Sequence, residues 1–146
     1  MGECLAFPAI FEGDDSPLIP EGIYELGYVD YSTWMFMGRQ PKVIIRFRVI
    51  DPGDYFGLVI PAYYNVTRII GKRGRNGGFK GNKRSNLVRD FYRVFPNQVL
   101  TRLDRIPLSK LETVVIHGTV KTVKQGFDQR AIPKPVQYSI VRRIER

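Results

Sequence analysis

The sequence contains few soft metal ligands and no long apolar run. Its 146 residues include one cysteine, Cys4, and one histidine, His117. A single cysteine excludes an intramolecular disulfide, and two such residues are too few for a structural zinc site. Because no stretch of about 18 apolar residues occurs, we expect neither a membrane-spanning helix nor a membrane partner. The N-terminus lacks the basic start and apolar run of a signal peptide, which indicates a cytoplasmic protein.

Acidic residues are also scarce over most of the chain. The sequence has 14 Asp and Glu against 23 Lys and Arg, a net charge of +9. Seven acidic residues and no basic residue lie in residues 1–30, whereas residues 68–93 carry nine basic groups and one acidic group. A solvated helix face usually alternates the two signs, and this second stretch does not. So concentrated a basic excess favours a polyanionic partner.

Short alternating segments, rich in β-branched and aromatic residues and separated by Pro and Gly, predict a mostly β fold. We expect five strands, at residues 23–31, 43–50, 55–66, 113–123 and 136–144. One helix is expected at residues 86–95, with Ser85 as its N-cap and Pro96 as its end. Residues 1–20 are expected to form an irregular acidic lead-in, and residues 21–146 one domain, because neither repeats nor a second core are visible.

The second expected strand has the clearest alternation. One face collects the apolar side chains and the other most of the basic ones, namely Val43, Ile45, Phe47 and Val49 against Lys42, Ile44, Arg46 and Arg48. Residues 32–41 are expected to form a connection that carries exposed aromatic residues. Residues 71–81 contain five glycines, which would cost too much backbone entropy in a helix, and we expect a flexible loop there.

Five strands with a helix between the third and the fourth is the element order of the OB-fold. Over residues 21–146, these strands, the helix and the basic glycine-rich run resemble the OB-fold single-stranded-DNA-binding proteins of phages and plasmids. The resemblance implies a five-stranded barrel that coats or protects single strands in replication, recombination or transfer of a mobile element. Bacterial members usually end in an acidic tail that recruits partners, whereas this chain ends in Arg142, Arg143, Glu145 and Arg146. An SH3-like barrel or a β-sandwich fragment is the alternative topology.

Single-strand binders combine a positive groove for phosphates with aromatic rings on which bases stack. Trp34 is the preferred stacking ring, because it stands among small and polar residues. Tyr63 and Tyr64 point to opposite faces of their strand, so at most one of them faces a ligand. The candidate nucleic-acid-binding residues are Trp34, Lys42, Arg46, Arg48, Tyr63, Arg68, Lys72, Arg73, Arg75, Phe79, Lys80, Lys83, Arg84, Lys121 and Phe127.

Nothing in the sequence indicates catalysis. Gly71 and Lys72 are followed by Arg73, where a phosphate-binding NTPase loop needs a hydroxyl, and the carboxylates are scattered. We therefore expect a protein that is not an enzyme and needs no metal or cofactor. The alternative function is an RNA-binding or assembly protein whose basic run meets RNA or an acidic partner. The sequence does not distinguish DNA from RNA, and edge strands are compatible with a homodimer or a higher oligomer.

Overall fold

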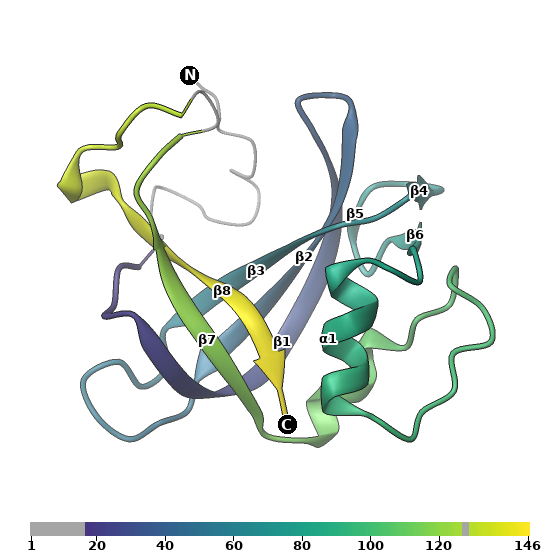
Figure 1. The fold of residues 1–146 in the computed structure, drawn as a ribbon, viewed down its shortest axis with the longest axis horizontal. Helices are drawn as coiled ribbons and strands as arrows, with labels where there is room; N and C mark the ends of the chain where they lie inside the picture. Colours follow the sequence, from purple (N-terminus) through teal and green to yellow (C-terminus); the bar gives the residue numbers. More distant parts are fainter. Residues whose placement is uncertain (1–16, 127–128) are drawn as a thin grey trace.

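The computed structural model describes residues 17–126 and 129–146 of the chain. Its main element is an antiparallel sheet with the strand order β3-β2-β1-β7-β8. The strands are β1 (Gly22–Phe36), β2 (Gln40–Val49), β3 (Val59–Asn65), β7 (Ile116–Val123) and β8 (Tyr138–Glu145). The sheet curves so strongly that β3 and β8, at the two ends of this order, lie close together (Figure 1). No ladder of hydrogen bonds joins these two strands within the described ranges.

The predicted mostly β fold with one α-helix after the third long strand is confirmed. The helix α1 (Asn86–Val94) follows β3 and precedes β7 in the chain. Ser85 is its N-cap, as predicted, because the Ser85 hydroxyl oxygen accepts a hydrogen bond of 3.3 Å from the Val88 amide. The helix stops before Pro96, which cannot continue it. Leu87, Phe91 and Val94 of α1 are buried and face the core.

Several predicted boundaries are wrong. β1 continues through residues 32–36, which were expected to form a connection, and only residues 37–39 make the turn to β2. Residues 55–58 form a turn, so that β3 begins at Val59. The structure also adds two 3-10 helices, Leu108–Thr113 and Lys134–Val136, at the expected starts of the last two strands. In each case pairing with a neighbouring strand, which local residue preference does not encode, decides where the strand begins and ends.

β1 is long because it pairs with different strands along its two edges. Residues 22–26 pair with β7, whereas residues 26–36 pair with β2. The register against β2 shifts between Tyr28 and Asp30. A bulge of this kind bends the strand and increases its twist. The second half of β1 is thereby directed away from β7 and gains room for another partner.

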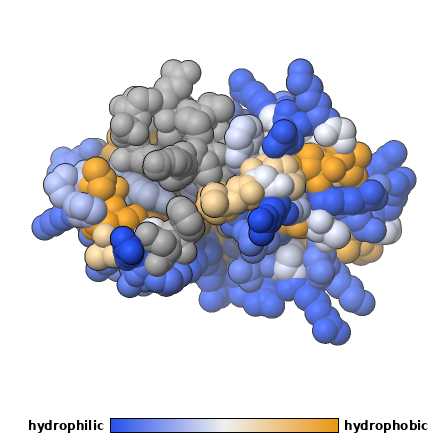
Figure 2. All heavy atoms as spheres, turned by 90° about the horizontal axis from the view of Figure 1, so that it is seen from above, coloured by the Kyte–Doolittle hydropathy of each residue, from blue (hydrophilic) through white to orange (hydrophobic). Residues whose placement is uncertain are grey.

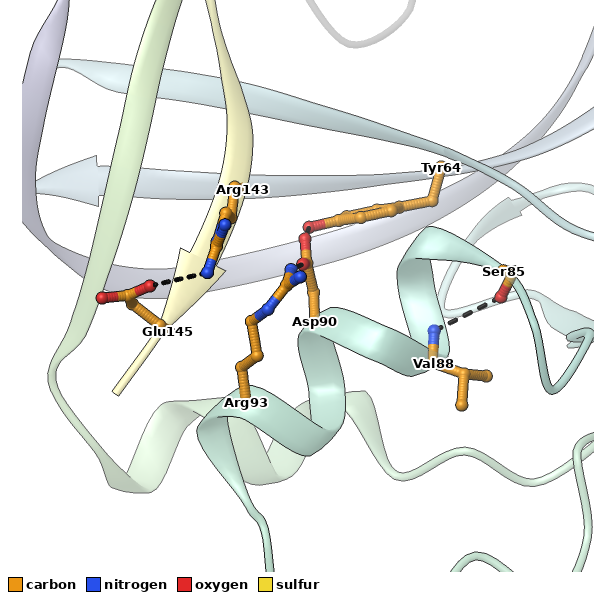
Figure 3. A network of polar contacts seen from close by, with 7 residues as sticks. All are labelled: Tyr64, Ser85, Val88, Asp90, Arg93, Arg143 and Glu145. Carbon is orange, nitrogen blue, oxygen red and sulfur yellow. Dashed lines mark hydrogen bonds and ion pairs between the residues drawn. The ribbon is translucent and has the colours of Figure 1, made fainter.

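The core lies on the inner side of the curved sheet and is closed by α1. The predicted apolar face of β2 is confirmed, since Val43, Ile45, Phe47 and Val49 are all buried. Removing one such side chain from water stabilises the fold by about 1.5–3 kcal/mol. A polar link also fastens α1 to the sheet, because the Tyr64 hydroxyl donates a 2.7 Å hydrogen bond to the Asp90 carboxylate, which is paired with Arg93 (Figure 3).

The expected lead-in at residues 1–20 is described only from residue 17 onwards. This part is not separate from the domain, because Pro17 and Ile19 hydrogen-bond to Ser139 of β8 and Ile19 is buried. Within the described part of the chain, no helix is long and apolar enough to cross a bilayer.

Candidate nucleic-acid interface

The face of β1, β2 and β3 that points away from the core carries several of the predicted binding residues. Directly paired residues of antiparallel strands lie on the same face, so the register defines rows across the three strands. One row joins Trp34, Lys42 and Asn65. Further rows place Ser32 beside Ile44 and Tyr63, and Asp30 beside Arg46 and Pro61. We call this surface the outer face; its residues are Asp30, Ser32, Trp34, Lys42, Ile44, Arg46, Pro61, Tyr63 and Asn65.

Trp34 had been expected in a connection between strands, but it lies on β1 and belongs to the outer face. Its half-buried ring lies under the guanidinium group of Arg73, 5.5 Å from the ring centroid. The neighbouring Lys42 places its ammonium group 5.4 Å from the ring centroid of Phe36. Burial lowers the pKa of Lys42 below its ordinary value. Two cations therefore lie against aromatic rings at this end of the sheet, a contact favoured by the ring quadrupole.

Asp30 is a largely buried carboxylate on the outer face. Arg46 donates two hydrogen bonds to it, of 2.7 and 2.6 Å, and the Asp30 side chain is only 8% exposed. Arg75 reaches the same carboxylate at 3.6 Å. The hydrogen bonds from Arg46 hold the pKa of Asp30 below its ordinary value, although burial acts in the opposite direction. Arg46, predicted to contact phosphates, thus has its charge balanced inside the protein.

The Asp30–Arg46 pair predicts a specific loss of stability in acid. Because the pKa of Asp30 is lower in the folded than in the unfolded protein, its contribution is fully present above the unfolded value, near 3.8. This contribution disappears as the pH falls through the folded pKa. We expect the free energy of unfolding of Asp30→Asn to fall less steeply than that of the wild type below about pH 4. Urea denaturation at a series of pH values measures the difference, and parallel curves would contradict the prediction.

Residues 71–81, which were expected to form a flexible loop, belong to a structured segment, residues 68–81, which we call the basic hairpin. It contains β4 (Arg68–Ile70), β5 (Gly74–Arg75) and β6 (Gly78–Lys80). β4 pairs with β6, and β5 pairs with β1, which places Arg75 next to Ser32 on the outer face. The edge of β1 that the bulge directs away from β7 is thus occupied by the basic hairpin (Figure 1).

The glycines of the basic hairpin permit close contact with β1. The Tyr31 hydroxyl donates a 2.9 Å hydrogen bond to the Gly77 carbonyl, and the Gly74 amide donates one of 3.1 Å to the Thr33 hydroxyl. A Cβ atom on Gly77 would lie 2.4 Å from the Thr33 hydroxyl oxygen, so only glycine fits. Glycine here serves approach between backbone segments and not mobility. The hairpin is held in a defined position beside the outer face.

The predicted stacking role of Phe79 is wrong. Its side chain is 4% exposed, belongs to the core, and meets the ring of Tyr31 edge-on with centroids 5.7 Å apart. Of the two adjacent tyrosines, Tyr64 is buried in the core and Tyr63 lies half-buried on the outer face, as the alternation required. Burial raises the pKa of Tyr63, which keeps its hydroxyl protonated. Tyr63 and Trp34 are therefore the predicted rings that this face retains.

Most predicted cations near the basic hairpin are exposed and free of carboxylates. Within the described ranges, no ion pair involves these side chains, which are Arg68, Lys72, Arg73, Lys80, Lys83 and Arg84. Arg75 has the long contact to Asp30 but is 73% exposed. Seen from above, strongly hydrophilic side chains project from the side of the molecule where β4 and β6 lie (Figure 2). This side presents positive charge to solvent.

Three predicted residues lie elsewhere. Arg48 is exposed on β2, at the end of that strand far from Trp34. Lys121 is exposed on β7, beside the start of β1 and near Glu21, so the structure does not bring it to the outer face. Phe127 lies outside the described residues.

Sequence reasoning missed Asp30, although it is the best-connected polar residue of the outer face. Its only signal would have been the register that opposes it to Arg46, which a single sequence does not show. The described part of the chain holds no group of three or more His, Cys, Asp or Glu side chains able to bind a metal. No protein-family model, curated protein or solved structure matches this chain.

Proposed function

We propose that this protein binds single-stranded nucleic acid, DNA in the first place, on the outer face and the adjoining basic hairpin, without catalysing a reaction. The observation that carries the proposal is the position of Trp34. Trp34 is half-buried on a sheet face, next to Lys42 and beside a hairpin rich in exposed cations, most of which form no ion pair with the described residues. Rings on a sheet flanked by positive charge are the arrangement that single-strand binders use, because every base has a flat face and every nucleotide has a phosphate.

The fold supports the same proposal. β1 lies between β2 and β7, β7 lies beside β8, β3 approaches β8, and α1 follows β3. This arrangement agrees with the five-stranded, partly open barrel of an OB-fold, and we propose that the domain is one. In that fold the face of the second and third strands and the loops after the first and fourth strands bind oligonucleotides. The corresponding parts here are the outer face, the turn at residues 37–39 and the connection at residues 124–137.

Charge is distributed so that bases and phosphates would take different places. Most of the outer face carries no free charge, because Asp30 balances Arg46 at one end and the middle row consists of Ser32, the buried Ile44 and Tyr63. Free cations gather on the basic hairpin instead. Bases are therefore expected over Trp34 and Tyr63, with their phosphates turned toward the hairpin. Coating single strands in replication, recombination or transfer of a mobile element in the cytoplasm is the role we propose for such binding.

Titration with labelled oligonucleotides tests this function. Single-stranded DNA, duplex DNA and RNA of equal length are compared at several salt concentrations, because affinity for a polyanion depends on salt. We expect single strands to bind more tightly than the duplex, whose stacked bases are not available to Trp34. Equal affinity for single strands and duplex would contradict the proposal and indicate general attraction to polyanions. Tighter binding of RNA than of DNA would favour the RNA-binding alternative.

A further inference from the structure

An open groove of about 320 Å³ lies between the end of β3 and the residues that precede α1. None of the candidate residues except Arg84 lines it. The complete lining is Asn65, Val66, Thr67, Asn82, Arg84 and Ser85. It therefore combines one cation, two amides and two hydroxyl groups, and contains no carboxylate. The guanidinium group and the side-chain N–H and O–H donors of this lining are suited to an anion.

The hydrogen bonds already made around the groove leave donors available. The Asn82 side-chain oxygen accepts a 2.8 Å hydrogen bond from the Arg84 amide, which leaves the Asn82 NH₂ group to donate. The Ser85 oxygen accepts from Val88, so its hydroxyl hydrogen is also available. Arg84 forms no ion pair with any residue of the described ranges. Hydrogen bonds from a guanidinium group to an anionic oxygen are stronger than neutral ones.

The groove continues the outer face. Asn65 lines the groove and is also the last member of the row that begins with Trp34 and Lys42. Adjacent strands lie about 4.8 Å apart, so the row covers roughly 10 Å between Trp34 on β1 and Asn65 on β3. A single-stranded nucleic acid that stacks a base on Trp34 and crosses β2 and β3 along this row reaches the groove directly.

We propose that this groove is a phosphodiester-binding subsite, in which Arg84, with Asn65 and Asn82, holds a backbone phosphate of a strand whose bases stack on the outer face. The inference rests on the proposed function and adds the direction in which the bound nucleic acid leaves the sheet, namely past β3. It assigns Arg84 a local contact and separates it from the general attraction exerted by the basic hairpin. Only strands long enough to extend from Trp34 past β3 occupy the subsite.

The test compares Arg84→Ala with Arg89→Ala over a series of oligothymidylates of increasing length. Arg89 is an exposed arginine of α1 that does not line the groove, so the two variants lose the same charge. We expect the shortest strands to bind both variants equally. Beyond a threshold length, Arg84→Ala should bind about tenfold more weakly than Arg89→Ala, because one hydrogen bond to a charged group is absent. Asn65→Asp, which places a carboxylate in the groove, should show the same threshold.

The outcomes separate the subsite from the function on which it rests. Equal affinity of the Arg84 and Arg89 variants at every length overturns the subsite, while binding that still depends on Trp34 leaves the function in place. A loss in Arg84→Ala that is already complete with the shortest strands also overturns it, because Arg84 then acts through general attraction. If no oligonucleotide binds to the wild type, both the function and the subsite are wrong. Inorganic phosphate as competitor shows whether an isolated anion suffices, and displacement of the shortest strands by it at matched ionic strength would contradict the length threshold.

Discussion

Replacing Trp34 by alanine is expected to weaken binding of single-stranded DNA by about 5- to 150-fold, the equivalent of ~1–3 kcal/mol for one stacked base. Trp34 presents a ring on the outer face and also contacts the guanidinium group of Arg73. Its loss removes a stacking surface and frees a cation that the ring holds in place. The fold should persist, because Trp34 does not belong to the buried core. Fluorescence anisotropy of a labelled oligonucleotide measures the affinity.

Phe56→Ala is the matched control for this variant. Phe56 is 62% exposed in the turn between β2 and β3, at the end of β2 opposite to Lys42. Removing its ring changes exposed aromatic surface without touching the outer face, and affinity should stay at the wild-type value. An unfolded Trp34→Ala variant would show that this ring is structural. Equal affinities of the two folded variants would remove the stacking argument.

Changing Lys72, Arg73 and Arg75 together to alanine should reduce affinity for all base sequences alike and flatten its dependence on salt. Each lost phosphate contact releases about 0.7 fewer counterions from a single strand, so three contacts lower the slope of log affinity against log salt by roughly two. Between about 50 and 200 mM salt, wild-type affinity should then fall roughly 18-fold more than that of the variant. Titrations at four or more salt concentrations give both slopes.

The control for this triple variant removes the same charge elsewhere. Arg89, Arg105 and Arg142 are exposed residues on α1, on the connection after it and on β8. Their replacement by alanine should change the slope less, because these side chains do not adjoin the outer face. Equal slopes in the two triple variants would show that the basic hairpin attracts the ligand only through net charge. An unchanged slope in the hairpin variant would place the phosphates elsewhere.

The fold was predictable where a local pattern and the tertiary structure agree. Alternation in β2 identified its buried face, and Ser85 with Pro96 marked the ends of α1, because capping and alternation act over a few residues. Position 79 illustrates the limit. A phenylalanine between glycines and lysines suggests an exposed loop, but pairing of β4 with β6 and contact with Tyr31 place its ring in the core. That information lies in residues far apart in the sequence.

The candidate interface depends even more on register. Alternation already placed Lys42 and Arg46 on one face of β2, whereas only the pairing of β1 with β2 brings Trp34 to that face. The same pairing opposes Asp30 to Arg46, which changes the expected role of Arg46 from phosphate contact to internal partner. The prediction that the glycine-rich run does not form a helix is correct. Its close contact with Thr33, which requires a glycine at position 77, cannot be inferred from the neighbouring residues in the sequence.

Emission of Trp34 during titration with single-stranded DNA shows whether bases stack on this ring. Trp34 is the sole tryptophan of the chain, so emission excited at the long-wavelength edge of indole absorption, where the eight tyrosines do not absorb, reports on the outer face alone. If bases stack on this ring, emission falls as single-stranded DNA is added and saturates at the concentration at which anisotropy of a labelled strand saturates. Duplex DNA of equal length should leave the emission of Trp34 nearly unchanged. Saturated anisotropy together with constant emission of Trp34 would show that single strands bind away from the outer face and would overturn the proposed stacking on Trp34.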